Sequence, residues 1–115
     1  MTDTAWQPLT DGTFHPVLHA SRGVALVLLT APSCSACKLA RRMLPGWLRE
    51  EVQHFYSLNV AEHAGIAKAY EVFHLPALFL FRDGLYHARL ETELSQTEMR
   101  TEVARLLAAD AQEEP

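Results

Sequence analysis

The sequence predicts an α/β fold in which helices cover both faces of one mixed central β-sheet. Apolar, strand-like runs alternate with segments of helical periodicity along most of the chain, which favours parallel strands. The run Val24–Leu29 is apolar at every position, as is typical of a strand buried on both faces. Near the C-terminus, Asp83 and Gly84 separate two strand-like runs, which predicts an antiparallel hairpin.

In chain order the predicted elements are β-α-β-α-β-α-β-β-α. The first strand, with Pro8 inside it, belongs at a sheet edge. Pro45 and Gly46 fall inside the second helix and should kink it or split it in two. Ser95 caps the last helix, with Glu98 completing a capping box. The predicted bounds are strands at 6–9, 23–30, 52–60, 77–81 and 85–91, and helices from Thr10 or Asp11 to about 21, from 34 to about 51, from 62 to 73, and from 95 onwards.

Length and composition predict one domain over residues 1–115, with residues 109–115 forming a frayed acidic tail. Hydrophobic residues make up 49% of the chain and charged residues 21%, as in an ordinary soluble globule. The net charge of −4 argues against nucleic acid or an anionic membrane as a partner. The N-terminus has no basic and apolar signal segment, and no run could span a bilayer, so we expect a cytoplasmic monomer without a cofactor.

Both cysteines of the chain lie where the buried strand gives way to a helix. Cys34 falls at the helix start, where unpaired N–H groups favour a thiolate, and Cys37 lies one turn further along. This spacing allows a disulfide, and Lys38, Arg41 and Arg42 should lower the thiol pKa further. The motif therefore predicts an attacking thiolate and a resolving thiol.

Two other interpretations of the cysteines stay open. They could be ordinary helix residues, or part of a metal site. A structural zinc site normally needs four ligands, whereas this chain has no second cysteine pair and no histidine pair at finger spacing beside the first. His15 and His19 are four residues apart but upstream, and we interpret them as solvated. No metal site is predicted.

Several stretches together resemble the thioredoxin family over essentially the whole chain. The C-x-x-C motif alone is a weak signal, but a proline about 40 residues later and a hairpin behind it make the signal strong. The order of elements also matches. The resembling stretches are Ser33-Cys34-Ser35-Ala36-Cys37, Leu58-Asn59-Val60, Tyr70-Glu71-Val72-Phe73-His74-Leu75-Pro76 and Phe79-Leu80-Phe81-Arg82-Asp83-Gly84.

The resemblance implies a thioredoxin fold and a role for each matching residue. Cys34 would be the exposed attacking thiol and Cys37 the buried resolving thiol. Pro76 would follow a cis peptide bond and lie against the disulfide, while Leu75 offers its backbone to an extended substrate. Without the resemblance, Pro76 would be interpreted as a trans turn proline. Ser33 and Thr92, at the family's docking positions, would complete the substrate-binding surface.

The sequence also departs from the family pattern. The two-cysteine frame is kept, while the internal proton acceptor and part of the docking surface differ. The family's usual helix proline comes three residues late, at Pro45. The replaced positions are Ser33 for the usual Trp, Ser35-Ala36 for Gly-Pro, Leu28 for a buried Asp, Ser57 for the Lys that accompanies it, and Thr92 for Gly.

The function that these features predict is thiol–disulfide oxidoreduction on partner proteins through Cys34 and Cys37. The alternative is a thioredoxin-fold chaperone or assembly module with little general reductase activity. A glutathione-using enzyme of glutaredoxin type is a third possibility. The resemblance implies a client protein carrying a disulfide or thiol, and thioredoxin reductase or glutathione as electron donor.

Overall fold

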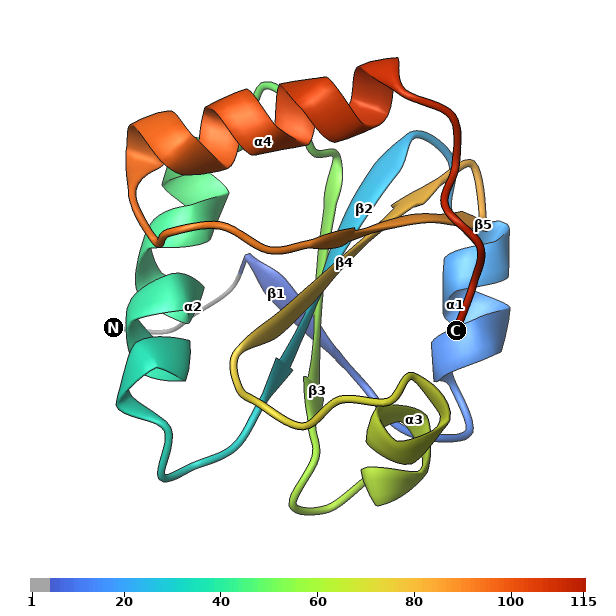
Figure 1. The fold of residues 1–115 in the computed structure, drawn as a ribbon. Helices are drawn as coiled ribbons and strands as arrows, with labels where there is room; N and C mark the ends of the chain where they lie inside the picture. The colour runs from blue at the N-terminus through green and yellow to red at the C-terminus, as the bar shows by residue number, and fades with distance from the viewer. Residues whose placement is uncertain (1–4) are drawn as a thin grey trace.

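The computed structural model describes residues 5–115, and the predicted α/β fold and order of elements are confirmed (Figure 1). The prediction that the N-terminus carries no signal segment rests mainly on residues 1–4, which lie outside this range. Among the described residues, every helix is too short or too polar to cross a bilayer. The elements are β1 Trp6–Leu9, α1 Phe14–Ala20, β2 Val24–Thr30, α2 Ser35–Trp47, β3 His54–Asn59, α3 Ala64–Ala69, β4 Ala77–Arg82, β5 Leu85–Leu90 and α4 Gln96–Ala108.

The five strands form one mixed sheet in the order β1-β3-β2-β4-β5. β3 pairs in parallel with β1 and with β2, whereas β4 pairs antiparallel with β2 and β5. The continuously apolar β2 lies at the centre, and all seven of its residues are buried. β1, which contains Pro8, lies at an edge, as predicted, because proline cannot donate to a central ladder.

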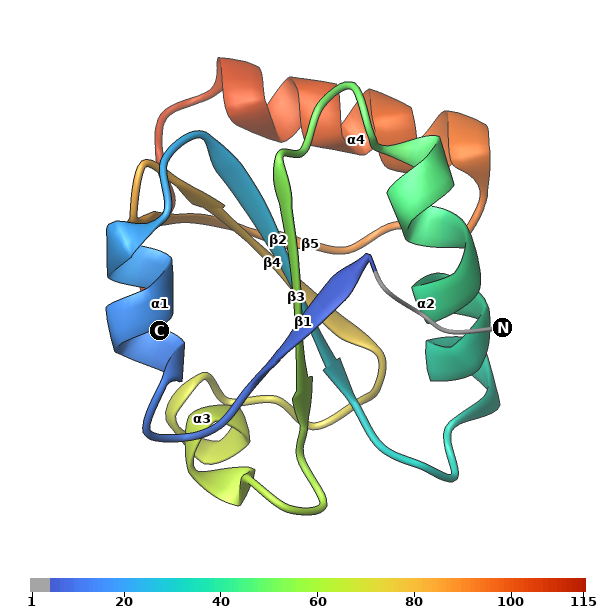
Figure 2. The ribbon, with the colours of Figure 1, turned by 180° about the vertical axis from the view of Figure 1, so that it is seen from behind.

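Helices cover both faces of the sheet, α2 and α4 on one side and α1 and α3 on the other (Figures 1 and 2). Successive side chains of a strand point to opposite faces, so β2 contributes to both cores and must be apolar throughout. The core under α2 and α4 includes Leu26, Leu28, Leu80, Ala40, Leu44, Met99 and Val103. The core under α1 and α3 includes Val27, Leu29, Phe79, Phe14, Leu18 and Ile66.

Of the kink or split predicted for the second helix, the split is wrong, because α2 continues through Pro45 and ends at Trp47. A proline in a helix has no N–H to give to the carbonyl four residues earlier. That carbonyl belongs to Arg41, and it accepts a hydrogen bond of 2.8 Å from the indole N–H of Trp6. The carbonyl freed by Pro45 therefore receives a hydrogen bond from Trp6 of β1, whose ring also packs edge-on against Phe55.

The two short helices differ from their predicted bounds. α1 begins at Phe14, after a turn in which the N–H groups of Thr13 and Phe14 donate to the carbonyl of Thr10. Asp11 does not cap α1; its carboxylate accepts from the N–H groups of Gly65 and Ile66 at the start of α3, at 3.3 and 3.1 Å. α3 ends at Ala69 rather than at residue 73.

The hairpin between β4 and β5 forms as predicted, and its ladder contains an irregularity. Asp83 and Gly84 have φ of 51° and 84°, which fits a two-residue turn of type I′. The register then slips between Leu80, opposite Ala88, and Phe81, opposite Tyr86. This β-bulge turns Tyr86 onto the face of α1 and α3, whereas Ala88 faces α2 and α4.

The predicted frayed tail after α4 instead contacts the edge strand β5. The N–H of Gln112 donates to the carbonyl of His87 at 2.7 Å, and its side-chain oxygen accepts from the N–H of Arg89 at 3.0 Å. The hydroxyl of Tyr70 donates to the carboxylate of Glu114. These contacts satisfy edge groups of β5 that would otherwise be open to another strand.

Candidate active site

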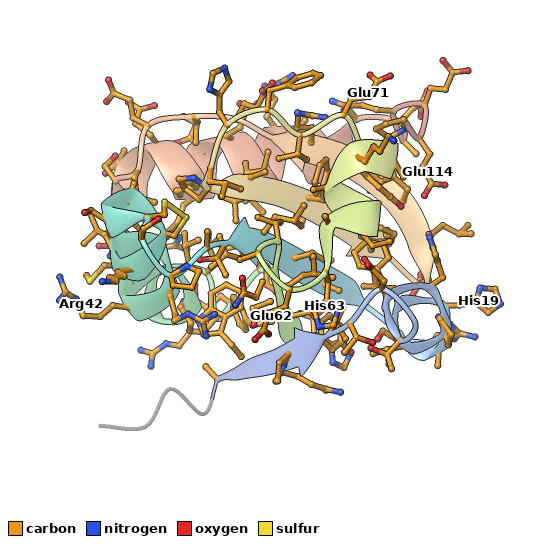
Figure 3. The ribbon with its side chains drawn as sticks, turned by 90° about the horizontal axis from the view of Figure 1, so that it is seen from below. His19, Arg42, Glu62, His63, Glu71 and Glu114 are labelled. Atoms are coloured by element: carbon orange, nitrogen blue, oxygen red, sulfur yellow. A yellow bond between two sulfur atoms is a disulfide. The ribbon has the colours of Figure 1, made fainter. Side chains whose placement is uncertain are left out.

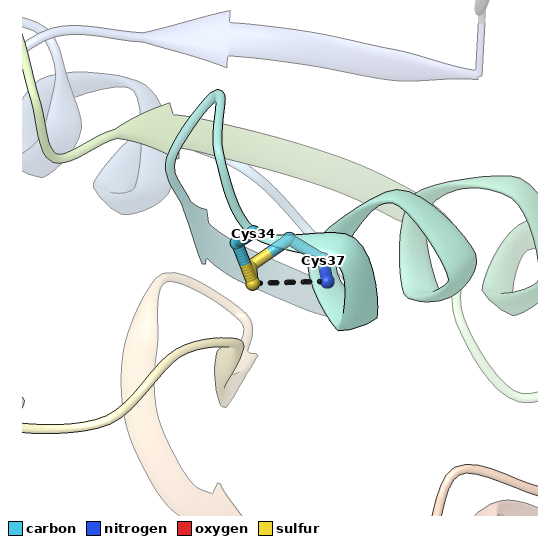
Figure 4. The surroundings of a disulfide bond; sticks show 2 residues. All are labelled: Cys34 and Cys37. Atoms are coloured by element: carbon cyan, nitrogen blue, oxygen red, sulfur yellow. Dashed lines mark hydrogen bonds between the residues drawn. A yellow bond between two sulfur atoms is a disulfide. The ribbon is translucent and has the colours of Figure 1, made fainter.

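Cys34 is the N-cap of α2, with extended backbone angles before the first helical residue. Its Sγ accepts the N–H of Cys37 at 3.1 Å, as Figure 4 shows, so the sulfur satisfies one of the unpaired donors of the helix start. The two cysteines form a disulfide with their Cα atoms 5.2 Å apart. The helix start thus places the outer sulfur where a negative charge would be stabilised.

The two sulfur-bearing residues differ in access. Cys34 is half-buried, whereas Cys37 is 0% exposed and belongs to the apolar stripe of α2 that continues with Ala40 and Leu44. Cys34 is therefore the more accessible of the two cysteines.

The basic residues predicted to tune the thiol lie on the first turns of α2. Lys38 is exposed and Arg41 half-buried, and both line a hollow of about 220 Å³ beside the loop leading to Cys34. The hollow also includes Asn59 at the end of β3. Two cations beside the helix start would favour a thiolate at Cys34 in the reduced protein.

Pro76 lies at the same edge of the sheet as the loop that carries Cys34. The Leu75–Pro76 peptide bond is cis, and Leu75 is half-buried against the core under α1 and α3. The next residue, Ala77, pairs with Leu29 near the end of β2. Because β2 runs directly into the loop before Cys34, this pairing brings Pro76 to the exit of β2.

Of the predicted docking residues, the structure brings Thr92 and Pro76 together. Both line a hollow of about 450 Å³, and neither cysteine is among its lining residues. Ser33 is exposed on the loop before Cys34 and does not line this hollow. The predicted docking surface therefore has two parts, one at the loop of Cys34 and one beyond Pro76.

The position that the resemblance assigns to a buried acid is part of an apolar core. Leu28 is 0% exposed and packs in the cluster under α2 and α4. Ser57, its register partner on β3, is 3% exposed. Leucine cannot accept a proton, so this position offers no carboxylate.

Sequence reasoning missed a polar cluster that lies beside the segment leading to Pro76. Burial and the hydrogen bond to Glu114 both raise the pKa of Tyr70, in that order of size. The guanidinium of Arg89 donates to the Tyr70 carbonyl at 2.7 Å and lies 5.0 Å from the centre of the Phe79 ring. These partners are far apart in the sequence and follow no spacing rule, so no sequence motif predicts their contacts.

Among residues 5–115, no group of three or more histidine, cysteine or acidic side chains is placed to hold a metal ion. His15 and His19 are exposed on α1.

The thioredoxin family model matches residues 5–105, which includes the cysteine pair and every strand. The chain belongs to the thioredoxin family. It is also similar to the thioredoxin-like protein YusE of Bacillus subtilis (strain 168), with 35% identity over 72 residues, which are 61% of this chain and 67% of that protein. Membership of the thioredoxin family, together with the Cys34–Cys37 pair, supports thiol–disulfide redox function in general terms.

Proposed function

We propose that this thioredoxin-family protein is a protein-disulfide oxidoreductase that reduces or exchanges disulfides in partner proteins. The thiolate of Cys34 attacks one sulfur of a client disulfide, forms a mixed disulfide and releases the other client sulfur as a thiolate, which takes up a proton. The thiolate of Cys37 then attacks the sulfur of Cys34 and releases the second client thiolate. The client gains two electrons and two protons, and the enzyme ends with the Cys34–Cys37 disulfide.

The observation that carries this proposal is the unequal placement of the two sulfurs. Cys34 is accessible at the start of α2 and its sulfur receives a backbone N–H, whereas Cys37 is fully buried one turn further along. An accessible, stabilised thiolate suits the attacking role. A buried partner at disulfide distance suits the resolving role, because it reacts only with a disulfide on Cys34.

We further propose docking roles for Leu75, Pro76, Thr92 and Ser33, on the edge of the sheet where β2 ends. Clients would lie across this edge as extended segments. Thioredoxin reductase or glutathione would return the enzyme to its dithiol form. Since both cysteines of the chain belong to this one pair, we propose a reducing compartment, the cytoplasm, and a monomeric enzyme.

The test is to trap the mixed disulfide. A Cys37→Ser variant should hold its client on Cys34 as a complex that dithiothreitol releases, and a Cys34→Ser variant should hold none. The wild-type protein should also reduce insulin with dithiothreitol as donor. A chaperone or assembly module would instead bind clients equally well in both variants and reduce no insulin, and an absolute need for glutathione would indicate an enzyme of glutaredoxin type.

A further inference from the structure

The hollow beyond Pro76 has an apolar floor. It lies between the segment leading into β4, the end of β5 and the beginning of α4, and its volume is about 450 Å³. Leu78, Leu90 and Met99 line it and are themselves almost fully buried. This volume falls at the lower end of the range typical of ligand pockets and can take one or two amino-acid side chains.

An unusually exposed aromatic side chain lines this hollow. Phe73 is 84% exposed, more than the other large exposed hydrophobic residues of the described chain, Leu85 at 67% and Leu39 at 39%. Its sequence neighbour Val72 packs against the core under α1 and α3. Exposed aromatic residues beside a concave apolar surface are typical of protein-binding sites, where they dominate the binding free energy.

Two exposed carboxylates lie at the hollow, whereas the charged residues of α2 are basic. Glu71 and Glu91 line the hollow, are exposed, and form no ion pair within residues 5–115. Arg89 also lines it, but its guanidinium is held by the Tyr70 carbonyl. Figure 3 shows Glu71 and Arg42 on opposite sides of the molecule, so the Glu71 carboxylate does not lie beside Arg42 of α2.

We propose that this hollow is a specificity pocket that takes an apolar side chain of the client, flanked by lysine or arginine. The proposal rests on the proposed redox function, because the client segment must lie across Pro76 to reach Cys34. The apolar side chain contacts Phe73 and the floor of the hollow. The flanking cation meets Glu71 and Glu91. Clients with an acidic residue at that position are disfavoured by like charge.

The experiment uses synthetic peptides that carry one cysteine as a mixed disulfide with 2-nitro-5-thiobenzoate. Attack by the Cys34 thiolate on the peptide sulfur releases the coloured thiobenzoate anion, so its release rate reports docking plus the first exchange. Three sets of peptides carry Leu-Lys, Leu-Glu or Ser-Lys at varied distances before or after the cysteine. Each rate is divided by the rate with 2,2′-dithiodipyridine, which has no peptide part.

In the reduced wild-type protein the best Leu-Lys peptide should react about fivefold faster than its Leu-Glu counterpart, the size expected for exposed charge pairs. Phe73→Ala should lower the normalised Leu-Lys rate about tenfold, as loss of an aromatic contact residue does. Leu85→Ala removes another exposed hydrophobic side chain and should leave that rate unchanged. Glu71→Lys with Glu91→Lys should reverse the preference for lysine, whereas Glu113→Lys, an exposed control in the tail, should not.

The outcomes separate this proposal from the proposed function. Equal normalised rates for all peptides, or equal effects of Phe73→Ala and Leu85→Ala, would overturn the specificity pocket while leaving the redox function standing. A wild-type protein whose Cys34 reacts with neither dithiodipyridine nor any peptide would overturn the redox function itself.

Discussion

Replacing Leu28 with Asp tests whether the apolar residue at the position that the resemblance assigns to a buried acid limits the second step of the proposed exchange. Leu28 is 0% exposed within a closely packed core, so its loss removes a full leucine side chain from that core. The lost packing and the buried polar group together should lower the free energy of unfolding by about 2–5 kcal/mol. At about 4 °C per kcal/mol for a chain of this size, the melting temperature should fall by roughly 8–20 °C.

The introduced carboxyl should also make stability depend on pH. Burial raises the pKa of a carboxyl because it disfavours the charged form. The folded variant then binds this proton more tightly than the unfolded chain does. Its stability should therefore fall further as the pH rises from about 4, the ordinary carboxyl value, through the raised folded value, and then level off.

Although Leu28→Asp should lower stability, it should raise the rate at which Cys37 resolves the mixed disulfide. Only the thiolate of Cys37 attacks, so in the wild-type protein resolution should accelerate about tenfold per pH unit below the Cys37 pKa. The fraction of the position-28 carboxyl that is ionised at neutral pH would accept this proton and raise the rate there, and the gain should grow as the pH rises through the raised pKa of that carboxyl. The assay forms the mixed disulfide of Cys34 with a fluorescent peptide at low pH, shifts the pH, and follows peptide release in a single turnover.

The matched control is Leu28→Asn, which has nearly the same shape and polarity but cannot accept a proton in this range. Both variants should lose stability, and only Leu28→Asp should resolve faster at neutral pH than its control. If the folded Asp variant is no faster than the Asn variant, Leu28 does not limit proton removal from Cys37, and the reasoning is refuted.

Three further predictions follow from single residues. The alkylation rate of the reduced protein, measured against pH, should show a Cys34 thiol pKa below about 8.5. Low-pH alkylation should disappear in Cys34→Ser, and the pKa should rise in Lys38→Glu. If neither variant changes the pH profile, the assignment of this thiolate to Cys34 is wrong. Gly84→Ala should lower the free energy of unfolding by about 2 kcal/mol or more in chemical denaturation, because φ is +84° and a Cβ would lie 2.5 Å from a carbonyl oxygen of α1. The control Gly46→Ala adds a Cβ in open space on α2 and should raise the free energy of unfolding by about 0.5–1 kcal/mol. Burial and Glu114 raise the pKa of Tyr70, so the free energy of unfolding of the wild-type protein should fall above about pH 10, where the tyrosine of the unfolded chain ionises. This fall should be smaller in Tyr70→Phe. If the free energy of unfolding of both proteins depends on pH in the same way, the contact between Tyr70 and Glu114 does not contribute.

The fold was predictable because its main signals are local. The continuous apolar run of β2 and the Asp83-Gly84 turn each act within a few residues, and both predictions are confirmed. One prediction failed because it depends on a distant partner. α2 survives Pro45 because Trp6, 35 residues before Arg41, satisfies the freed carbonyl. No pattern within the helix could report that contact.

The cysteine pair of the site was predictable from the sequence, whereas the hollow beyond Pro76 was not. The motif located both cysteines, and the burial of Cys37 follows from its place on the apolar stripe of α2. The hollow beyond Pro76 was not predictable, because it is made by three segments that only the fold brings together. Phe73 is the last residue of the helix predicted from 62 to 73, and helical spacing would place it on the same face as Ile66, Ala69 and Tyr70. α3 ends earlier, and at Glu71 the backbone takes a left-handed φ of 55°, so Phe73 leaves the stripe and is exposed.

The burial of β2 on both faces links the stability of the fold to the chemistry proposed for it. A strand buried on both faces gains free energy from every apolar residue, and Leu28 contributes to the core directly under α2. A carboxylate there would help Cys37 to lose its proton but would remove that contribution. In the proposed exchange, the core at Leu28 is apolar and the proton of Cys37 would leave by another route, through water at the half-buried Cys34 or through a group of the client. On this mechanism, a client that itself supplies the base would be released faster than one that does not, so the choice of client would act on the resolving step as well as on docking.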